Sequence, residues 1–290
     1  MKKLLAFALM LFVPVSMFAF DDDDGNESKS VKKRNNIYVA FETGTYKYRE
    51  PHMEYPIQDK GHKNGISVEY IGRGIMDLGG FSDKPDNSFA TLEARYMTGK
   101  VDYTGYLMDG TPHSAKGEKD YYFEGRLTFG KTYALMDAWE LWPYLGFGWR
   151  RLVNNGENVD PSAYKRISNY YYVPLGVRFV KDVDGGFTIA FIGEFDWLLL
   201  GKQSSRLFDD GSYLNNRQKK GLGARFSVKV DVPVSPKIGV FVEPYFRMWK
   251  IQNSEVQWVW AWNGSGYEQV GLLEPYNTTR ELGIKAGFYF

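Results

Sequence analysis

The stretch 281–290 reads ELGIKAGFYF and alternates between apolar residues and polar or glycine residues. One parity holds Leu282, Ile284, Ala286, Phe288 and Phe290. A period of two places such a set on one face of a β-strand. Terminal residues of soluble domains are usually polar and loosely packed. An apolar, alternating terminus therefore indicates an ordered strand, and the question is what kind of sheet it completes.

The composition narrows the class of protein. The chain has 290 residues and no cysteine, which excludes disulfides and thiolate metal sites. Lys and Arg number 36 against 35 Asp and Glu, so the basic excess of a nucleic-acid-binding surface is missing. Aromatic residues make up 17% of the chain and glycine is frequent, with 31 residues. This mixture favours strands and turns over helices.

The first nineteen residues have the layout of a secretory signal peptide. Lys2 and Lys3 precede an apolar run, and Ala19 marks the expected cleavage site. A membrane-anchor helix is the alternative, but the run is short of the about 20 apolar residues that span a bilayer. Residues 20–36 are charged and polar, and we expect a mobile tail there. Residues 37–290 then form the folded domain.

Alternating segments recur through the rest of the chain. We predict ten strands, at residues 37–48, 65–73, 88–106, 119–131, 140–153, 167–181, 187–201, 218–232, 237–251 and 278–290. Their length suits tilted strands that cross an apolar band of about 25 Å, and membrane barrels of bacteria have an even number of strands. The fold class predicted is therefore all-β, a single transmembrane antiparallel barrel of ten strands, with eight or twelve as alternatives.

Charged residues occupy mid-strand positions opposite the apolar parity, which predicts an ion-paired lumen. The acidic set is Glu42, Glu69, Glu93, Glu124, Glu194, Asp196, Glu243 and Glu281, and the basic set is Arg95, Arg126, Arg150, Arg178, Arg225, Lys229, Arg247 and Lys285. A ten-stranded barrel is only slightly wider than the eight-stranded type that side chains fill. We favour a plug of ion pairs over a narrow charged conduit.

Taken together, these features resemble Gram-negative outer-membrane β-barrels over residues 37–290, at the level of the class. Aromatic residues near strand ends are expected to form interfacial girdles outside the barrel: Tyr46, Tyr48, Tyr106, Trp142, Tyr144, Trp197 and Trp249. The resemblance implies that Phe288 and Phe290 form the signal read by the barrel-assembly machinery, although Lys285 stands where that signal usually has glycine. It also implies a monomer in the outer membrane, in contact with lipid and lipopolysaccharide.

The connections predict the orientation. Those after the odd-numbered strands are long and polar, whereas three of the four after even-numbered strands are tight. Short turns face the periplasm in outer-membrane barrels. We therefore expect both termini on the periplasmic side and the long loops at the cell surface.

The sequence offers little for catalysis. Only three histidines occur, and all lie in predicted loops; His52 and His62 share the first loop with Glu54 and Asp59, a weak metal-site candidate. Omptin proteases, also ten-stranded, use Asp and His pairs at the rim, but no histidine follows Asp209 and Asp210. We expect no catalytic, metal or cofactor site. The leading hypothesis is a non-enzymatic surface protein, structural or binding through its loops; the alternatives are a small pore and, third, a hydrolase.

Overall fold

A computed structural model describes residues 36–51, 57–74, 87–107, 110–136, 138–183, 186–207, 211–262 and 265–290. The predicted signal peptide at 1–19 and all but Asn36 of the predicted tail lie outside these residues, so both stay predictions. Asn36 begins the first strand. Among the described residues, no helix combines the length and hydropathy of a membrane span.

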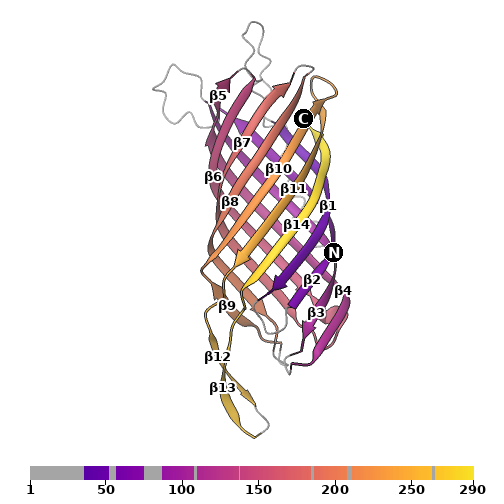
Figure 1. Cartoon of the computed structure of the whole chain (residues 1–290), viewed down its shortest axis with the longest axis vertical. Helices are drawn as coiled ribbons and strands as arrows, with labels where there is room; N and C mark the ends of the chain where they lie inside the picture. The colour runs from indigo at the N-terminus through magenta and orange to yellow at the C-terminus, as the bar shows by residue number, and fades with distance from the viewer. Residues whose placement is uncertain are drawn as a thin grey trace. The chain divides into compact units, whose positions relative to one another are not determined.

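Ten long strands form the wall of a barrel (Figure 1). They are β1 (Asn36–Glu50), β2 (Ile57–Arg73), β3 (Ser88–Tyr106), β4 (Pro112–Lys131), β6 (Trp139–Asn155), β7 (Lys165–Val183), β8 (Phe187–Ser205), β10 (Gly221–Pro233), β11 (Gly239–Ile251) and β14 (Asn277–Tyr289). The short strands β5 (Tyr133–Met136) and β9 (Leu214–Gln218) extend the same sheet, and a 3₁₀ turn η2 (Gly156–Asn158) follows β6. Strands β12 (Gln257–Trp262) and β13 (Tyr267–Leu272) pair only with each other, as a separate hairpin.

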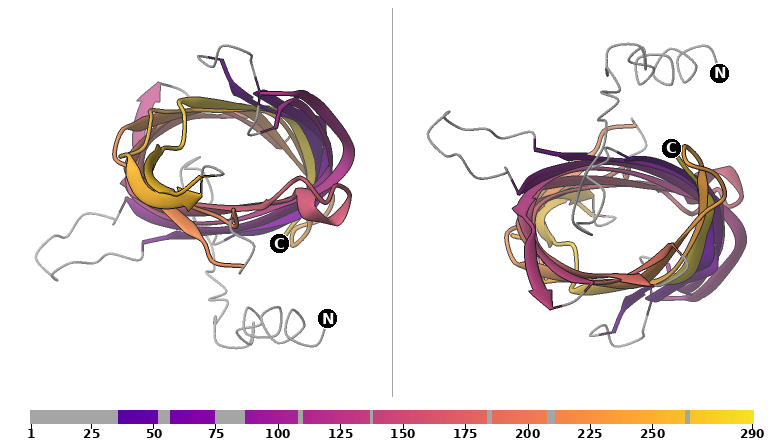
Figure 2. Two further views of the ribbon diagram at one scale, coloured as in Figure 1. Left: turned by 90° about the horizontal axis from the view of Figure 1, so that it is seen from below. Right: turned by 90° about the horizontal axis from the view of Figure 1, so that it is seen from above.

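The sheet closes on itself. Every wall strand pairs antiparallel with its neighbours, and β14 pairs with β1 along its length, with Lys285 opposite Glu42. The ring also ends on a reciprocal pair of backbone hydrogen bonds between Ile37 and Phe290, at 3.2 and 3.0 Å. Figure 2 shows the closed ring from both ends. The predicted ten-stranded antiparallel barrel is confirmed.

The strands run further than the sequence predicted at one end of the barrel. The loop predicted between residues 48 and 65 is shorter because β2 already begins at Ile57. The loop predicted between residues 106 and 119 is shorter because β4 begins at Pro112. The eighth predicted strand corresponds to β10, and β9 lies almost entirely in the loop predicted before that strand. The fifth predicted loop contains the β12–β13 hairpin, which projects from this end of the barrel (Figure 1). We call this end the hairpin end, and the opposite end the turn end.

The outer wall has an apolar zone toward the turn end. Outward residues there are exposed and hydrophobic, among them Val39, Phe41, Val68, Leu92, Phe129, Leu175, Phe195, Phe226, Leu282 and Phe288. Toward the hairpin end, outward positions become polar and basic: Lys47, Arg49, Lys60, Lys100, Lys119 and Arg280. A bilayer requires an apolar band on the outside of such a barrel, flanked by polar zones.

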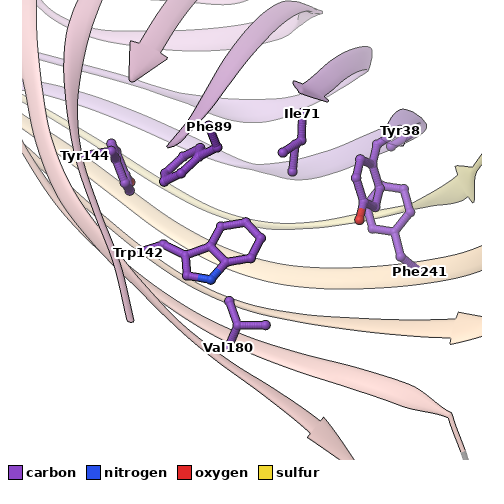
Figure 3. Close-up of a cluster of buried hydrophobic side chains, with 8 residues drawn as sticks. Tyr38, Ile71, Phe89, Trp142, Tyr144, Val180 and Phe241 are labelled. Atoms are coloured by element: carbon purple, nitrogen blue, oxygen red, sulfur yellow. The ribbon is translucent and has the colours of Figure 1, made fainter. Parts of the chain in front are cut away.

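The interior holds aromatic side chains as well as charges, and here the predicted girdle was largely wrong. Tyr46, Tyr48, Trp142, Tyr144 and Trp249 are buried inside the barrel, whereas Trp197 is exposed on the outer wall. The parity rule explains the error, because each of the five buried rings occupies an inward position on its strand. Figure 3 shows how Trp142 and Tyr144 lie among inward side chains near the turn end.

Inward glycines make room for these rings. A Cβ at Gly148 would lie 2.2 Å from the ring of Tyr172, and one at Gly176 would lie 2.3 Å from the ring of Tyr144. Each ring therefore folds over a glycine on the neighbouring strand, in the arrangement known as aromatic rescue. Glycine is required at these positions by close packing in the lumen.

Candidate functional site

The sixteen charged residues predicted for the lumen lie inside the barrel, and each makes at least one ion pair. Thirteen form one connected network: Glu42, Glu93, Arg95, Glu124, Arg126, Arg150, Glu194, Asp196, Arg225, Glu243, Arg247, Glu281 and Lys285. The other three, Glu69, Arg178 and Lys229, form a second group.

Arg95 is a centre of the larger network. Its Nε donates to Glu42 at 2.6 Å, and its Nη2 donates to Glu281 at 3.1 Å and to the Tyr245 hydroxyl at 3.2 Å. The Arg95 side chain has 0% exposure. Buried ion pairs stabilise a fold only when further hydrogen bonds satisfy the remaining groups. Tyr245 supplies such a bond to Arg95.

The ion pairs reach across the lumen. Arg150 on β6 donates to Glu281 on β14 at 2.6 Å, although five strand-to-strand steps around the ring separate these strands. Arg225 on β10 donates to Glu124 on β4 at 2.5 Å, four steps away. Direct contact between opposite walls means that side chains fill the barrel at this level. The charged residues therefore form a cross-braced layer rather than the lining of a wide channel.

A smaller acidic group lies near the hairpin end. The Tyr48 hydroxyl is 2.7 Å from Glu50 and 3.1 Å from Glu274, and Arg166 pairs with Glu50 and Asp59. A cavity of about 10 Å³, room for roughly one water, is lined by Asp59, Arg166 and seven neighbours. Burial, and then the negative charge of Glu50, raises the pKa of Glu274 to about 7. Glu274 follows β13 and lies outside the wall strands.

The structure separates the residues of the weak metal-site candidate. Asp59 and His62 both lie in β2, with Asp59 buried inside and His62 exposed outside, bonded to Thr43. His52 and Glu54 lie outside the described residues, as do Asp209 and Asp210. Over the ranges that the structure describes, no cluster of His, Asp and Glu could hold a metal ion.

His113 forms the one histidine–aspartate pair in the described chain. It lies in β4, not in a loop as predicted, and its Nε2 contacts Asp160 in the link after η2. Hydrogen bonds from the Ser162 hydroxyl and backbone lower the pKa of Asp160 below its usual range. The Ser162 hydroxyl donates to Asp160 at 2.6 Å, so these contacts do not make the serine–imidazole bond of a hydrolase triad.

The β12–β13 hairpin carries a row of exposed tryptophans that the sequence analysis missed. Trp258, Trp260 and Trp262 are 67%, 64% and 59% exposed. Alternate positions on one strand share a face, so the three indoles form a line. The available signal was the repeat in QWVWAW, with tryptophan at every second residue. The alternation covers six residues, which is shorter than a strand that crosses a bilayer, so this stretch falls within the loop predicted between residues 251 and 278.

The base of the hairpin is fixed to the barrel. The Ser254 backbone N–H donates to the Glu274 carbonyl at 2.9 Å, and the Glu274 N–H donates to the Ser254 hydroxyl at 2.8 Å. Asn216 on β9 donates to the carbonyls of Glu255 and Leu272. The two strands of the hairpin thus leave the barrel from a defined position beside β9.

Among the comparisons with known proteins, the alignment with one solved structure supports the fold. No protein-family model and no curated protein sequence matches the chain. Among solved structures, the outer-membrane protease OmpT from Escherichia coli aligns with a TM-score of 0.54 at 14% identity, over 91% of this chain and 99% of that one. The transport unit of the autotransporter AIDA-I from Escherichia coli aligns at 0.42 and 11%, over 96% of each chain. The translocator domain of the autotransporter NalP from Neisseria meningitidis aligns at 0.39 and 12%, over 98% and 97%.

At such identities the likeness to OmpT concerns the fold alone. The fold is that of the Gram-negative outer-membrane β-barrels, which have an apolar outer face toward lipid and a polar interior. The chain is an outer-membrane β-barrel protein.

Proposed function

We propose that the protein is a non-enzymatic surface protein that binds a ligand through the β12–β13 hairpin, with the barrel as a closed anchor. The observation that carries the proposal is the row of three exposed tryptophans on the β12–β13 hairpin. The hairpin projects beyond the barrel wall (Figure 1). Contiguous exposed apolar surface is unfavourable in water and usually marks an interaction site. Tryptophan is also among the residues most enriched in binding hot spots.

The interior supports an anchor over a pore. Ions that cross the barrel would have to break contacts such as Arg150–Glu281 and Arg225–Glu124, which join opposite walls. Removing one partner of a buried pair typically costs about 3–5 kcal/mol. The charge network is better suited to hold the wall rigid beneath the hairpin than to conduct.

The outer wall supports the proposed orientation and lipid partners. With the hairpin end at the cell surface, the apolar zone contacts lipid and the basic zone lies beside the phosphates of lipopolysaccharide. Lys47 stands directly opposite Arg280 on one side and Lys60 on the other. Like charges in direct cross-strand pairs destabilise a sheet, and bound phosphate would offset that repulsion. The ring leaves no wall edge open, in keeping with a monomer.

The hydrolase alternative has less support. The His113–Asp160 pair resembles two parts of a catalytic group, but Ser162, the serine bonded to it in the described residues, contacts the aspartate and not the imidazole. A nucleophile activated by a base must be within hydrogen-bond reach of that base.

Replacement of the hairpin tests the proposal. Residues 257–272 would be exchanged for a short Gly-Ser turn, leaving Ser254 and Glu274 in place. Intact cells that display either form would be applied to immobilised neutral polysaccharides, matrix proteins and phosphatidylcholine bilayers. We expect the replacement to reduce retention at least tenfold on one of these surfaces while heat-modifiable barrel is unchanged. Equal retention of both forms on every surface would overturn the proposal.

A further inference from the structure

The exposed tryptophans form one side of a two-stranded platform. In the hairpin register Trp262 lies opposite Tyr267, Trp260 opposite Gln269, and Trp258 opposite Gly271. These six residues share one face of the hairpin, which we call the aromatic face. Successive indoles along β12 are two residues apart, which corresponds to about 6.8 Å. The platform is therefore narrow, linear and regularly spaced.

Two contacts within the aromatic face hold the rings at its two ends in place. Trp262 and Tyr267 pack edge to face, with ring centroids 5.3 Å apart and planes at 67°. A Cβ at Gly271 would lie 3.2 Å from the Trp258 ring, so glycine lets this indole extend across β13. Rings that are ordered before binding lose less conformational entropy when a ligand arrives. The aromatic face is therefore suited to bind a ligand that has a flat surface.

The charge of the hairpin restricts the class of that partner. Residues 257–272 contain a single charged side chain, Glu268, and no Lys or Arg. Glu268 lies opposite Ala261, on the other face from the tryptophans. Single-stranded nucleic acids also stack on rows of aromatic rings, but the grooves that bind them are basic. Anionic membranes likewise attract segments rich in Lys and Arg.

The position of the rings argues against membrane insertion and against a globular protein partner. The residues between the two strands read NGSG, so the connection is polar and the apolar rings line the flank. A segment that enters a bilayer tip-first would carry its apolar residues at the tip. A protein surface would meet the face through irregular hot spots, whereas a row of like rings at constant spacing suits a ligand that repeats.

We propose that the aromatic face binds a linear, uncharged oligosaccharide, which stacks sugar rings on successive indoles. This inference rests on the proposed function and names its ligand class. The C–H face of a pyranose is flat and apolar and packs on an indole, while its hydroxyls point outward around the ring. Gln269, Tyr267 and the indole N–H groups supply donors and acceptors at the edges of the platform.

The test uses the full-length protein in detergent micelles and neutral linear oligosaccharides of two to six sugars, with β-linked glucose, N-acetylglucosamine and mannose series. Binding would be followed by calorimetry and by tryptophan fluorescence. We expect affinity for at least one series to rise with length and to level off once the three indoles are covered. Trp260→Ala should weaken that binding at least tenfold, because it removes the central ring.

Matched variants separate a lost contact from a disturbed hairpin. Trp260→Tyr keeps an aromatic ring and should restore most of the affinity. Val259→Ala lies on the opposite face of the same strand and should change the affinity less than twofold. Gln269→Ala should weaken binding by a smaller factor than Trp260→Ala.

Several outcomes would overturn the inference. They are no binding in any series, binding that Trp260→Ala leaves unchanged, or affinity that follows added negative charge instead of chain length. Hairpin-dependent retention on matrix protein or phosphatidylcholine alone would also overturn it, yet leave the proposed function standing. If retention does not depend on the hairpin on any surface, both this inference and the proposed function are wrong.

Discussion

Arg95 shows what the sequence could and could not foretell about a single residue. Parity on β3 predicted correctly that Arg95 points inward together with Glu93. The partners could not be read from parity, because they depend on how the sheet curves. Arg95 pairs with Glu42 and Glu281, while Glu93 pairs with Arg126 and Lys285. The local sequence of a strand determines whether a side chain points inward. The partner of that side chain across the lumen depends on the curvature of the whole sheet.

Substitution of Arg95 tests the role of the network. Arg95→Met keeps the length of the side chain but leaves Glu42 and Glu281 with fewer partners in a buried position. We expect a loss of about 3–5 kcal/mol in the free energy of unfolding. Denaturant unfolding in lipid or detergent, followed by tryptophan fluorescence, measures it. Lys100→Met on the exposed side of β3 is the control and should stay within about 0.5 kcal/mol; equal effects of the two changes would contradict the assignment.

Glu274 predicts how stability depends on pH. Tyr48 has one hydroxyl hydrogen and lies within reach of both Glu50 and Glu274, so a proton on Glu274 completes the set of hydrogen bonds. Its pKa of about 7 in the fold lies above the ordinary 4.5. The folded state thus binds the proton more tightly than the unfolded chain. The resulting stabilisation is full below about pH 4.5 and is lost as the pH rises through 7.

We therefore expect the thermal midpoint in detergent to be lower at pH 8 than at pH 5. Glu274→Gln cannot titrate and should flatten this dependence. Glu255→Gln is the control, because Glu255 is exposed in the same connection. A parent protein with the same midpoint at both values would argue against a protonated Glu274.

At the scale of elements, the wall strands could be predicted well from the sequence, whereas the β12–β13 hairpin could not. A wall strand has one face in lipid and one in the packed lumen, so its alternation is strong. In the β12–β13 hairpin, tryptophans are exposed on one face, and a residue on the other face such as Val259 is half-buried. The hairpin therefore lacks the contrast between a lipid face and a packed face that makes a wall strand recognisable. The girdle prediction failed for a related reason, because position near a strand end was weighed without parity.

Strand β14 carries the next prediction. Phe288 and Phe290 are 55% and 50% exposed on the lipid side, whereas Tyr289 is tilted against Tyr38 inside, with ring centroids 5.4 Å apart. Changing both phenylalanines to Ser should reduce assembled barrel to less than half, because lipid contact and the proposed assembly signal are lost together. Tyr289→Ser should have a clearly smaller effect. The readout is the heat-modifiable band on gels, and similar loss in both variants would count against the signal.

At the scale of the whole molecule, the braced lumen predicts a barrel that does not conduct. Purified protein in a planar bilayer should show no stable unitary steps, since contacts such as Arg150–Glu281 join opposite walls. A double variant, Arg150→Ala with Arg225→Ala, should increase the frequency of transient openings by removing two of these braces. Stable steps from the parent protein would favour the pore alternative.

The pairing of β1 with β14 has a consequence for how the molecule is made. Val39 and Phe288 are neighbours in the wall although they lie 249 positions apart in the sequence (288 minus 39). Every other wall contact can form between strands close in sequence, so this seam closes late, after a long loop has been ordered. Until then both strands present unpaired amides, which hydrocarbon does not tolerate. A partly assembled barrel is therefore unstable in the bilayer. Any factor that assists assembly must cover the two unpaired strand edges until β1 and β14 pair.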